Sequence, residues 1–301
     1  QDQIVTKLGE GFLALTNAPM VAAGAEAPAA TPSQPAVATP TDVAGGLSLD
    51  MPGAAGFGVA EGAGILTGRP TLRPGRSDVR PDIDGRLDDV IWQDAIHITE
   101  FVQQNPVEGA PATEDTDVWI AYDSQNLYIA VHAHYSDPSI MRANRVDRDR
   151  ASQDDLLTIY FDTFMDQQRS YDFDVNAYNV QGDGIINISG RRGRGSGIPF
   201  ADRSWDTLFD SGAQIVEDGF TAEMAIPFKS LRYPQQPEGV PHRWGFQFVR
   251  EIKELNREDI VWAPMSRDVS SFMAQMGVIE GMTNLSTSRN LETVSYTHLT
   301  L

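Results

Sequence analysis

The sequence contains no cysteine, so it can form neither a disulfide nor a thiolate metal site, and it offers no cysteine nucleophile. It has no run of about 18 apolar residues, which excludes a transmembrane helix. Basic side chains are scarce, with 23 Lys and Arg against 42 Asp and Glu and a formal net charge of −19. Nucleic acids and anionic lipids bind to cationic surfaces, so both are disfavoured as partners.

Aromatic residues are nearly absent from the beginning of the chain. The sequence has 5 Trp, 8 Tyr and 13 Phe, but only Phe12 and Phe57 precede Trp92. The same region is rich in Ala, Pro and Gly, and such a segment buries too little apolar surface to offset the entropy of ordering it. We therefore expect residues 1–76 to be a leader and a flexible linker, in which residues 11–27 have the pattern of a signal-peptide remnant.

From Val118 onward, apolar and polar residues alternate with a period of two, which indicates β-strands. Residues 117–123 and 127–135 predict one β-hairpin, and residues 213–228 predict another. Further strands are expected at 156–164, 171–180, 184–189, 244–254, 259–265 and 275–281. Short polar connections and little helix favour an all-β protein, with an antiparallel, jelly-roll-like β-sandwich over residues 77–282.

The stretch PDIDGRLDDVIWQDA, residues 81–95, invites comparison with a calcium-binding EF-hand loop. Counted from Asp82, however, Gly85 is the fourth residue and the twelfth is Gln93, so the ligand spacing of that loop is not met. We expect instead a turn at Gly85 and then a short amphipathic helix that buries Trp92.

The alternation also predicts which side chains point away from the core. In the strands at 156–164, 171–180 and 244–254, alternate positions carry polar or aromatic groups that form a candidate ligand face, the alternative being an ordinary solvated sheet face. An exposed ring of Trp205, after the basic glycine-rich segment 191–197, is a further candidate because it could stack on a ligand. The candidate ligand-binding residues are Tyr160, Asp174, Asn176, Tyr178, Gln247 and Trp205.

Two groups of residues are candidate metal ligands. His132 and His134 would share one face of a strand, a spacing that zinc sites use, but the sequence indicates no third ligand. Four aspartates lie around the strand at 156–164, where oxygen-rich turns could hold calcium or could simply cap the turns. These candidate calcium ligands are Asp154, Asp155, Asp162 and Asp166.

Several stretches, in this order, resemble the family-nine carbohydrate-binding modules, which are DOMON-like β-sandwiches. They are IDGRLDDVIW, DVWIAYDSQNLYIAVHAHYSDP, QDDLLTIYFDT, YDFDVNAYNVQGD, GFTAEMAIPFKSLRY, WGFQFVRE and VWAPM, and they cover roughly residues 80–282. The resemblance implies a non-catalytic module that binds a saccharide. In sugar-binding members two tryptophans clamp the sugar. The matching positions here, near Ser152 and near Ser270 or Ser271, are not tryptophan. Groups that hold sugar hydroxyls correspond to positions near Thr158 and Asp174.

Within that family, PFKSLRY and WGFQFVREI are typical of a group in which the module precedes an outer-membrane β-barrel. The resemblance implies export to the bacterial envelope, in the periplasm or outer membrane, and a covalently linked barrel as partner. The segment RNLET (289–293) resembles the start of that barrel, so residues 283–301 would be its truncated beginning. The final VSYTHLTL resembles translated adapter sequence.

Two other functions remain open at this point. One is glycoside hydrolysis, which needs two suitably spaced carboxylates, for example Asp174 with Glu223 or with Asp155. Family-nine modules occur on hydrolases, so the full-length protein could act in carbohydrate breakdown even if this module has no activity. The other is an envelope module that binds a protein.

Overall fold

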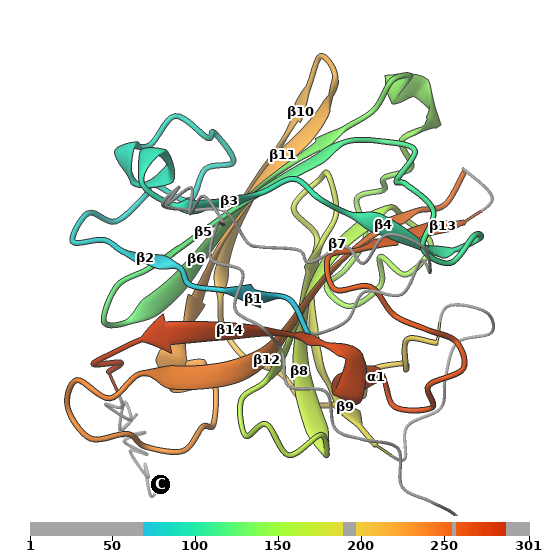
Figure 1. Ribbon diagram of the computed structural model, residues 1–301. Coiled ribbons are helices and arrows are strands. Elements are labelled where there is room, and N and C mark those ends of the chain that lie inside the picture. Colours follow the sequence, from blue (N-terminus) through green and yellow to red (C-terminus); the bar gives the residue numbers. More distant parts are fainter. Residues whose placement is uncertain (1–68, 189–196, 255–256, 287–301) are drawn as a thin grey trace, which may run out of the picture. The chain divides into compact units, whose positions relative to one another are not determined.

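A computed structural model of the protein describes residues 69–188, 197–254 and 257–286, which form two β-sheets with little helix (Figure 1). Residues 1–68 of the predicted leader, residues 191–196 of the glycine-rich segment and residues 287–301 of the expected barrel start lie outside these residues. None of the described helices has the length and apolar character needed to cross a membrane. The helices are η1 (Val90–Gln93), η2 (Pro138–Ile140), η3 (Phe228–Ser230) and α1 (Phe272–Gln275).

One sheet has eight strands in the order β1-β14-β12-β7-β8-β9, with β13 paired to β12 and β4 paired to β13. Its pairs are antiparallel except β1 with β14. The strands are β1 (Thr71–Leu72), β4 (Val102–Asn105), β7 (Leu156–Asp162), β8 (Arg169–Val175), β9 (Gln181–Asn187), β12 (His242–Ile252), β13 (Glu258–Val261) and β14 (Gly277–Met282).

The other sheet has six strands in the order β10-β11-β6-β5-β2, with β3 also paired to β5. The hairpins β5–β6 and β10–β11 are the two that the alternation predicts, so both are confirmed. Strands β1 and β2 lie before residue 77, where we expected the sandwich to begin. The strands are β2 (Gly75–Arg76), β3 (Ile96–Ile98), β5 (Thr116–Tyr122), β6 (Asn126–His134), β10 (Asp210–Val216) and β11 (Gly219–Pro227).

The main hydrophobic core is formed by the inward faces of both sheets. Phe161 of β7, Phe173 of β8 and Val131 of β6 are fully buried in it, and Phe161 and Phe173 lie on the strand faces opposite the predicted ligand face. This arrangement is the β-sandwich that the sequence predicts. The outer face of the eight-stranded sheet carries a second, smaller apolar cluster, in which Phe272 of α1 packs edge-on against Tyr160 with 5.0 Å between ring centroids.

The stretch 81–95 folds against the outer face of the six-stranded sheet. Gly85 has φ +86°, and a Cβ at this position would lie 2.8 Å from the backbone of Ala213, so both the conformation and the space require glycine. Trp92 is buried, as expected, and belongs to the short 3₁₀-helix η1. The backbone amides of Asp84 and Gly85 donate to the carboxylate of Glu223, which holds this turn against β11.

Candidate functional site

A pocket of about 440 Å³ opens on the outer face of the eight-stranded sheet. Its floor comes from β7 and β8, one wall from β12 and β13, and another from residues 198–203. Ser152 and Thr158, two of the positions that the family resemblance indicates, line it. The lining residues that carry the chemistry are Tyr160, Asp172, Phe200, Arg203, Glu251 and Asp259.

The strand register assembles the floor of the pocket. On β7, Tyr160 lies opposite Asp172 of β8 and opposite Gln247 of β12, while Thr158 lies opposite Asp174. Since alternate residues of a strand share a face, these side chains lie on the outer face while their neighbours fill the core. Burial raises the pKa of the Tyr160 hydroxyl well above its usual value, so this group stays protonated and can donate a hydrogen bond.

Arg203 bridges two buried carboxylates of β8. Its Nη2 lies 3.1 Å from Oδ2 of Asp172 and 2.6 Å from Oδ2 of Asp174. Burial raises the pKa of Asp172 to about 7, with the Arg203 charge opposing the shift and Asp174 adding to it. Near neutral pH, Asp172 is therefore present as both acid and carboxylate, and it can donate or accept a hydrogen bond.

The opposite wall carries a second set of charges. Lys253 forms an ion pair with Glu251, and both line the pocket. Burial raises the pKa of Asp259 to about 7, and the neighbouring Glu251 charge adds to that shift. The pocket thus presents donors and acceptors around its floor, an arrangement suited to a ligand with many hydroxyl groups.

Phe200 is the aromatic side chain that sequence reasoning missed. It lines the pocket and is 67% exposed, although it is large and apolar. The sequence predicts an exposed ring in the segment after the glycine-rich stretch, but at Trp205 and not at Phe200. A sequence signal for Phe200 is absent, because it lies outside any strand and follows no alternation.

Two of the predicted ligand residues are engaged inside the protein. Gln247 is fully buried, and its side chain bonds both the N–H and the C=O of Ala263. Asn176 is also fully buried and donates to the carbonyl of Asn144 and to Asp154. Both side chains lie on the outer face as predicted, but neighbouring segments cover that face at these positions. The expectation that they contact a ligand is corrected accordingly.

The other four predicted ligand residues do not lie in one place. Tyr160 lines the pocket, and Asp174 lies beside it under Arg203. Tyr178 lines a different pocket, where the Arg145 guanidinium lies 4.5 Å from its ring centroid. The Trp205 ring packs 5.1 Å from that of Tyr171 and 6.1 Å from that of Phe173, so it is partly buried against the core and is not the freely exposed ring that we expected.

The four candidate calcium ligands do not converge. Asp154 and Asp155 precede β7, whereas Asp162 ends it and Asp166 follows in the next turn. A strand of 7 residues spans roughly 20 Å, so these carboxylates cannot share an ion. They stabilise turns and loops: Asp154 accepts from Asn144, Asp155 from Tyr135, Asp162 from Gln167 and Asp166 from Gln168. The prediction of one calcium site shared by these four aspartates is therefore wrong.

The two carboxylate pairs that could support glycoside hydrolysis, Asp174 with Glu223 and Asp174 with Asp155, do not face each other across a cleft. Asp174 lies on β8 of one sheet, whereas Glu223 lies on β11 of the other and accepts from Trp92 Nε1 at 2.8 Å. Asp155 is buried, and it accepts from the Tyr135 hydroxyl and the amides of Arg142 and Lys253. Through these hydrogen bonds, Glu223 and Asp155 each hold neighbouring segments of the chain together.

The sequence model of a family described as "Carbohydrate family 9 binding domain-like" matches residues 83–263. Among curated proteins, the chain is similar to endo-1,4-beta-xylanase C of Paenibacillus barcinonensis, with 25% identity over 152 residues. That alignment covers 50% of this chain and only 12% of the xylanase.

Two solved structures are also similar. A putative carbohydrate-binding protein from Bacteroides uniformis aligns with a TM-score of 0.54 at 12% identity, over 70% of this chain and 98% of that one. A family 9 carbohydrate-binding module from Caldicellulosiruptor kristjanssonii, in complex with cellotriose, aligns with a TM-score of 0.47 at 16% identity, over 76% of this chain and all of that one. The likeness to the first of these shows a shared fold.

Proposed function

This chain belongs to the carbohydrate family 9 binding domain-like family, and we propose that it binds a saccharide in the pocket over β7, β8 and β12. The observation that carries the proposal is the combination, in one pocket, of an exposed aromatic ring with charged groups, of which Asp172 is buried and Arg203 and Glu251 reach the surface. Phe200 offers an apolar face of the kind that packs on a pyranose ring, while Asp172, Arg203 and Glu251 offer partners for hydroxyl groups.

We expect the binding to be weak and the module to have no catalytic activity. The positions that correspond to the paired tryptophans of sugar-binding members carry Ser152 and Ser270 or Ser271, which provide no stacking surface. An aromatic platform contributes on the order of 1 kcal/mol beyond its buried area, and a tenfold change in affinity corresponds to about 1.4 kcal/mol. With Phe200 in place of two tryptophans, dissociation constants of about 0.1–1 mM are expected.

We propose further that the module acts at the bacterial envelope, in the periplasm or outer membrane, ahead of a covalently linked outer-membrane barrel. The resemblance of PFKSLRY (227–233) and WGFQFVREI (244–252) to that group supports this. An involvement of the whole protein in carbohydrate breakdown is supported by the similarity to a xylanase. Cell fractionation of a host expressing the complete gene tests the location, and recovery in the cytosol would contradict it.

Isothermal titration calorimetry with soluble cello-, xylo- and manno-oligosaccharides tests saccharide binding. Phe200→Ala removes the exposed ring and should weaken the binding about tenfold. Phe164→Ala is the matched control, because Phe164 is also exposed, at 51%, but lies in the turn after β7 and outside the pocket. His132→Ala should have no effect, since His132 lies on the other sheet.

Two results would overturn the proposal. One is the absence of measurable heat with every oligosaccharide at millimolar concentration, which would favour the protein-binding alternative. The other is an equal loss of affinity in Phe200→Ala and Phe164→Ala, which would show that the pocket is not where the sugar binds.

A further inference from the structure

The outer face of the six-stranded sheet carries a row of imidazoles and carboxylates that the saccharide pocket does not use. His132 and His134 are two positions apart on β6 and point to the same side, away from the core residues Val131 and Ala133. Asp218 lies in the turn between β10 and β11, next to the end of β6. The sequence placed the two histidines on one face but did not indicate this third residue.

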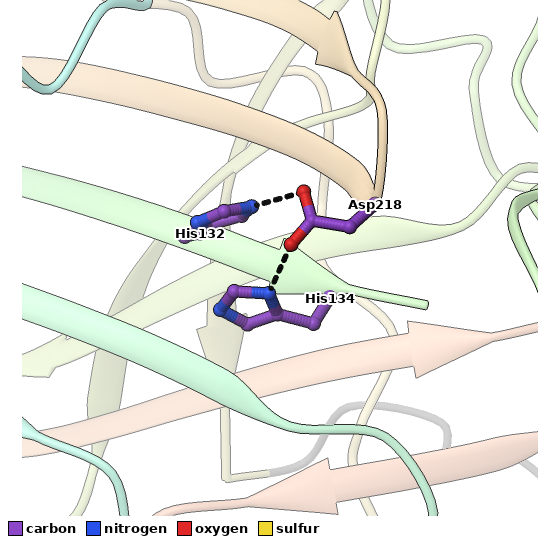
Figure 2. A group of neighbouring side chains, drawn as sticks. All are labelled: His132, His134 and Asp218. Atoms are coloured by element: carbon purple, nitrogen blue, oxygen red, sulfur yellow. Dashed lines mark hydrogen bonds and ion pairs between the residues drawn. The ribbon is translucent and has the colours of Figure 1, made fainter. Parts of the chain in front are cut away.

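Figure 2 shows the Asp218 carboxylate between the two histidine rings, with one oxygen directed at each. Oδ1 lies 3.1 Å from Nε2 of His132, and Oδ2 lies 2.9 Å from Nδ1 of His134. One ligand atom from each residue can be chosen so that all three lie within 4.8 Å of one another, and in the described part of the chain no other group of three such side chains does so.

We propose that His132, His134 and Asp218 form a binding site for a divalent transition-metal ion of the zinc class. Two imidazoles and one carboxylate are ligands that zinc accepts, whereas calcium prefers a shell of oxygens. Zinc bonds of about 2.0–2.1 Å in a tetrahedron separate ligand atoms by roughly 3.4 Å. The two nitrogen–oxygen separations, one to each oxygen of Asp218, are somewhat shorter than that value, so the half-buried rings and the carboxylate would move slightly apart to admit the ion.

The hydrogen bonds of His134 also fit a metal ion at this position. Its Nδ1 faces Asp218, and its Nε2 lies 2.8 Å from Oδ2 of Asp117. A neutral imidazole has a single N–H and can donate to only one of these two carboxylates. A metal ion on Nδ1 resolves the conflict, because Nε2–H then donates to Asp117. Zinc-ligating histidines commonly have this carboxylate partner, which fixes the tautomer and the orientation of the ring.

The backbone fixes the three ligand positions before any ion binds. The carbonyl of Asp218 accepts a 2.7 Å hydrogen bond from the N–H of Tyr135, the residue after His134. The other Asp117 oxygen lies 2.6 Å from Nε2 of His97, whose ring stacks on Trp119 with 4.5 Å between centroids. The supporting carboxylate is therefore itself held in place, and the ordering entropy of the site is largely met by the fold.

The site leaves room for a further ligand on the metal. The Asp218 side chain is 55% exposed, and with His134 and Asp117 it lines a pocket of about 670 Å³ at this end of the sheet. Three protein ligands plus an open position are the arrangement in which zinc keeps a bound water. The ion would also join the β10–β11 turn to β6, and so stabilise the folded state.

The test uses the full chain without a polyhistidine tag, titrated calorimetrically with zinc chloride alone and, separately, with calcium chloride. One zinc ion should bind per chain, and calcium should give no heat at the same concentration. At a free zinc concentration 100-fold above the dissociation constant, the melting temperature should rise by about 5–10 °C. Cobalt should give the visible absorption bands of a tetrahedral site.

Matched variants separate this site from incidental binding. His134→Gln and Asp218→Asn should weaken zinc binding by at least about 100-fold, and Asp117→Asn by about 10–100-fold. Glu217→Gln removes the same charge from the adjacent exposed residue of the same turn and should bind zinc as the unaltered chain does. Circular dichroism verifies that each variant is folded.

The proposal fails if the unaltered chain gives no heat with zinc and no cobalt bands. The three residues and Asp117 would then form a hydrogen-bonded network that holds no metal. It fails equally if zinc binds but Glu217→Gln weakens the binding as much as Asp218→Asn, because the ion would then be held by the general negative charge of the turn.

Discussion

Nε1 of Trp92 donates a 2.8 Å hydrogen bond to Oε1 of Glu223, 131 positions further along the chain. Oε2 of the same carboxylate accepts the backbone N–H groups of Asp84 and Gly85. One buried carboxylate of β11 therefore holds both the opening turn and the helix η1. Glu223 is fully buried, so each of its donors replaces a water that the carboxylate would otherwise keep.

The first prediction concerns that bond. Trp92→Phe keeps an aromatic ring but removes a donor from a buried carboxylate, which should lower the free energy of unfolding by about 1–3 kcal/mol beyond the loss of ring volume. Trp262→Phe is the control, because Trp262 is equally enclosed and its Nε1 has no hydrogen-bond partner in the described part of the chain. Urea unfolding of both variants gives the comparison, and equal losses would contradict the role of the bond.

A second prediction concerns the turn before η1. Gly85→Ala should destabilise the protein by about 2–4 kcal/mol, because the φ of +86° is unfavourable for alanine and the new Cβ would meet the Ala213 backbone at 2.8 Å. Gly109→Ala carries only the backbone penalty of about 1–2 kcal/mol, since Gly109 has φ +75° and nothing within 4 Å of its Cβ position. Thermal unfolding distinguishes the two, and similar melting temperatures would show that the contact with Ala213 relaxes freely.

The third prediction is a pH dependence that originates in the pocket. Burial raises the folded-state pKa of Asp172 from 3.8 to about 7, so between about pH 4 and pH 7 the folded chain holds a proton that the unfolded chain has released. The contribution of Asp172 to stability is therefore present at low pH and is lost as the pH rises toward 7. The side chain of Asp172→Asn cannot ionise. The free energy of unfolding of this variant, relative to that of the unaltered chain, should therefore rise by roughly 2–4 kcal/mol from pH 4.5 to pH 8.

Urea unfolding of both chains at pH 4.5 and pH 8 measures this gain. Asp166→Asn is the control, because Asp166 lies exposed in a turn and its replacement should not change the difference between the two pH values. A relative stability of Asp172→Asn that does not change with pH would indicate that Asp172 stays ionised in the folded protein.

A fourth prediction concerns Arg203. Arg203→Met removes the cation between Asp172 and Asp174 and should destabilise the protein at pH 8 by about 1–3 kcal/mol, because two buried carboxylates lose their partner. At pH 5 the loss should be smaller, since burial already favours the protonated acids. Arg169→Met is the control: Arg169 begins the same strand, is exposed, and makes no ion pair within the described residues. A loss independent of pH would mean that Arg203 acts through packing.

The alternation of apolar and polar residues determined much of the fold. It gave the two hairpins, the strands that became β7, β8 and β12, and the inward direction of Phe161 and Phe173. This information is local, because a period of two follows from the geometry of one strand and the need to bury one of its faces. The burial of Trp92 was likewise visible in the sequence.

Tertiary structure alone decided what lies over the outer faces. Gln247 and Asn176 point outward as predicted, yet Ala263 and Asn144 from other segments cover them. Arg203 reaches Asp174 from outside any strand, and no periodicity predicts such a contact.

The same limit explains the two metal predictions. Asp154 and Asp162 are near in sequence but lie at opposite ends of a rigid strand, so they cannot share an ion. Asp218 is 84 positions from His134, yet the pairing of β11 with β6 brings them together. Sequence determines which face of a strand a side chain occupies, whereas strand pairing and loop placement determine which side chains meet there.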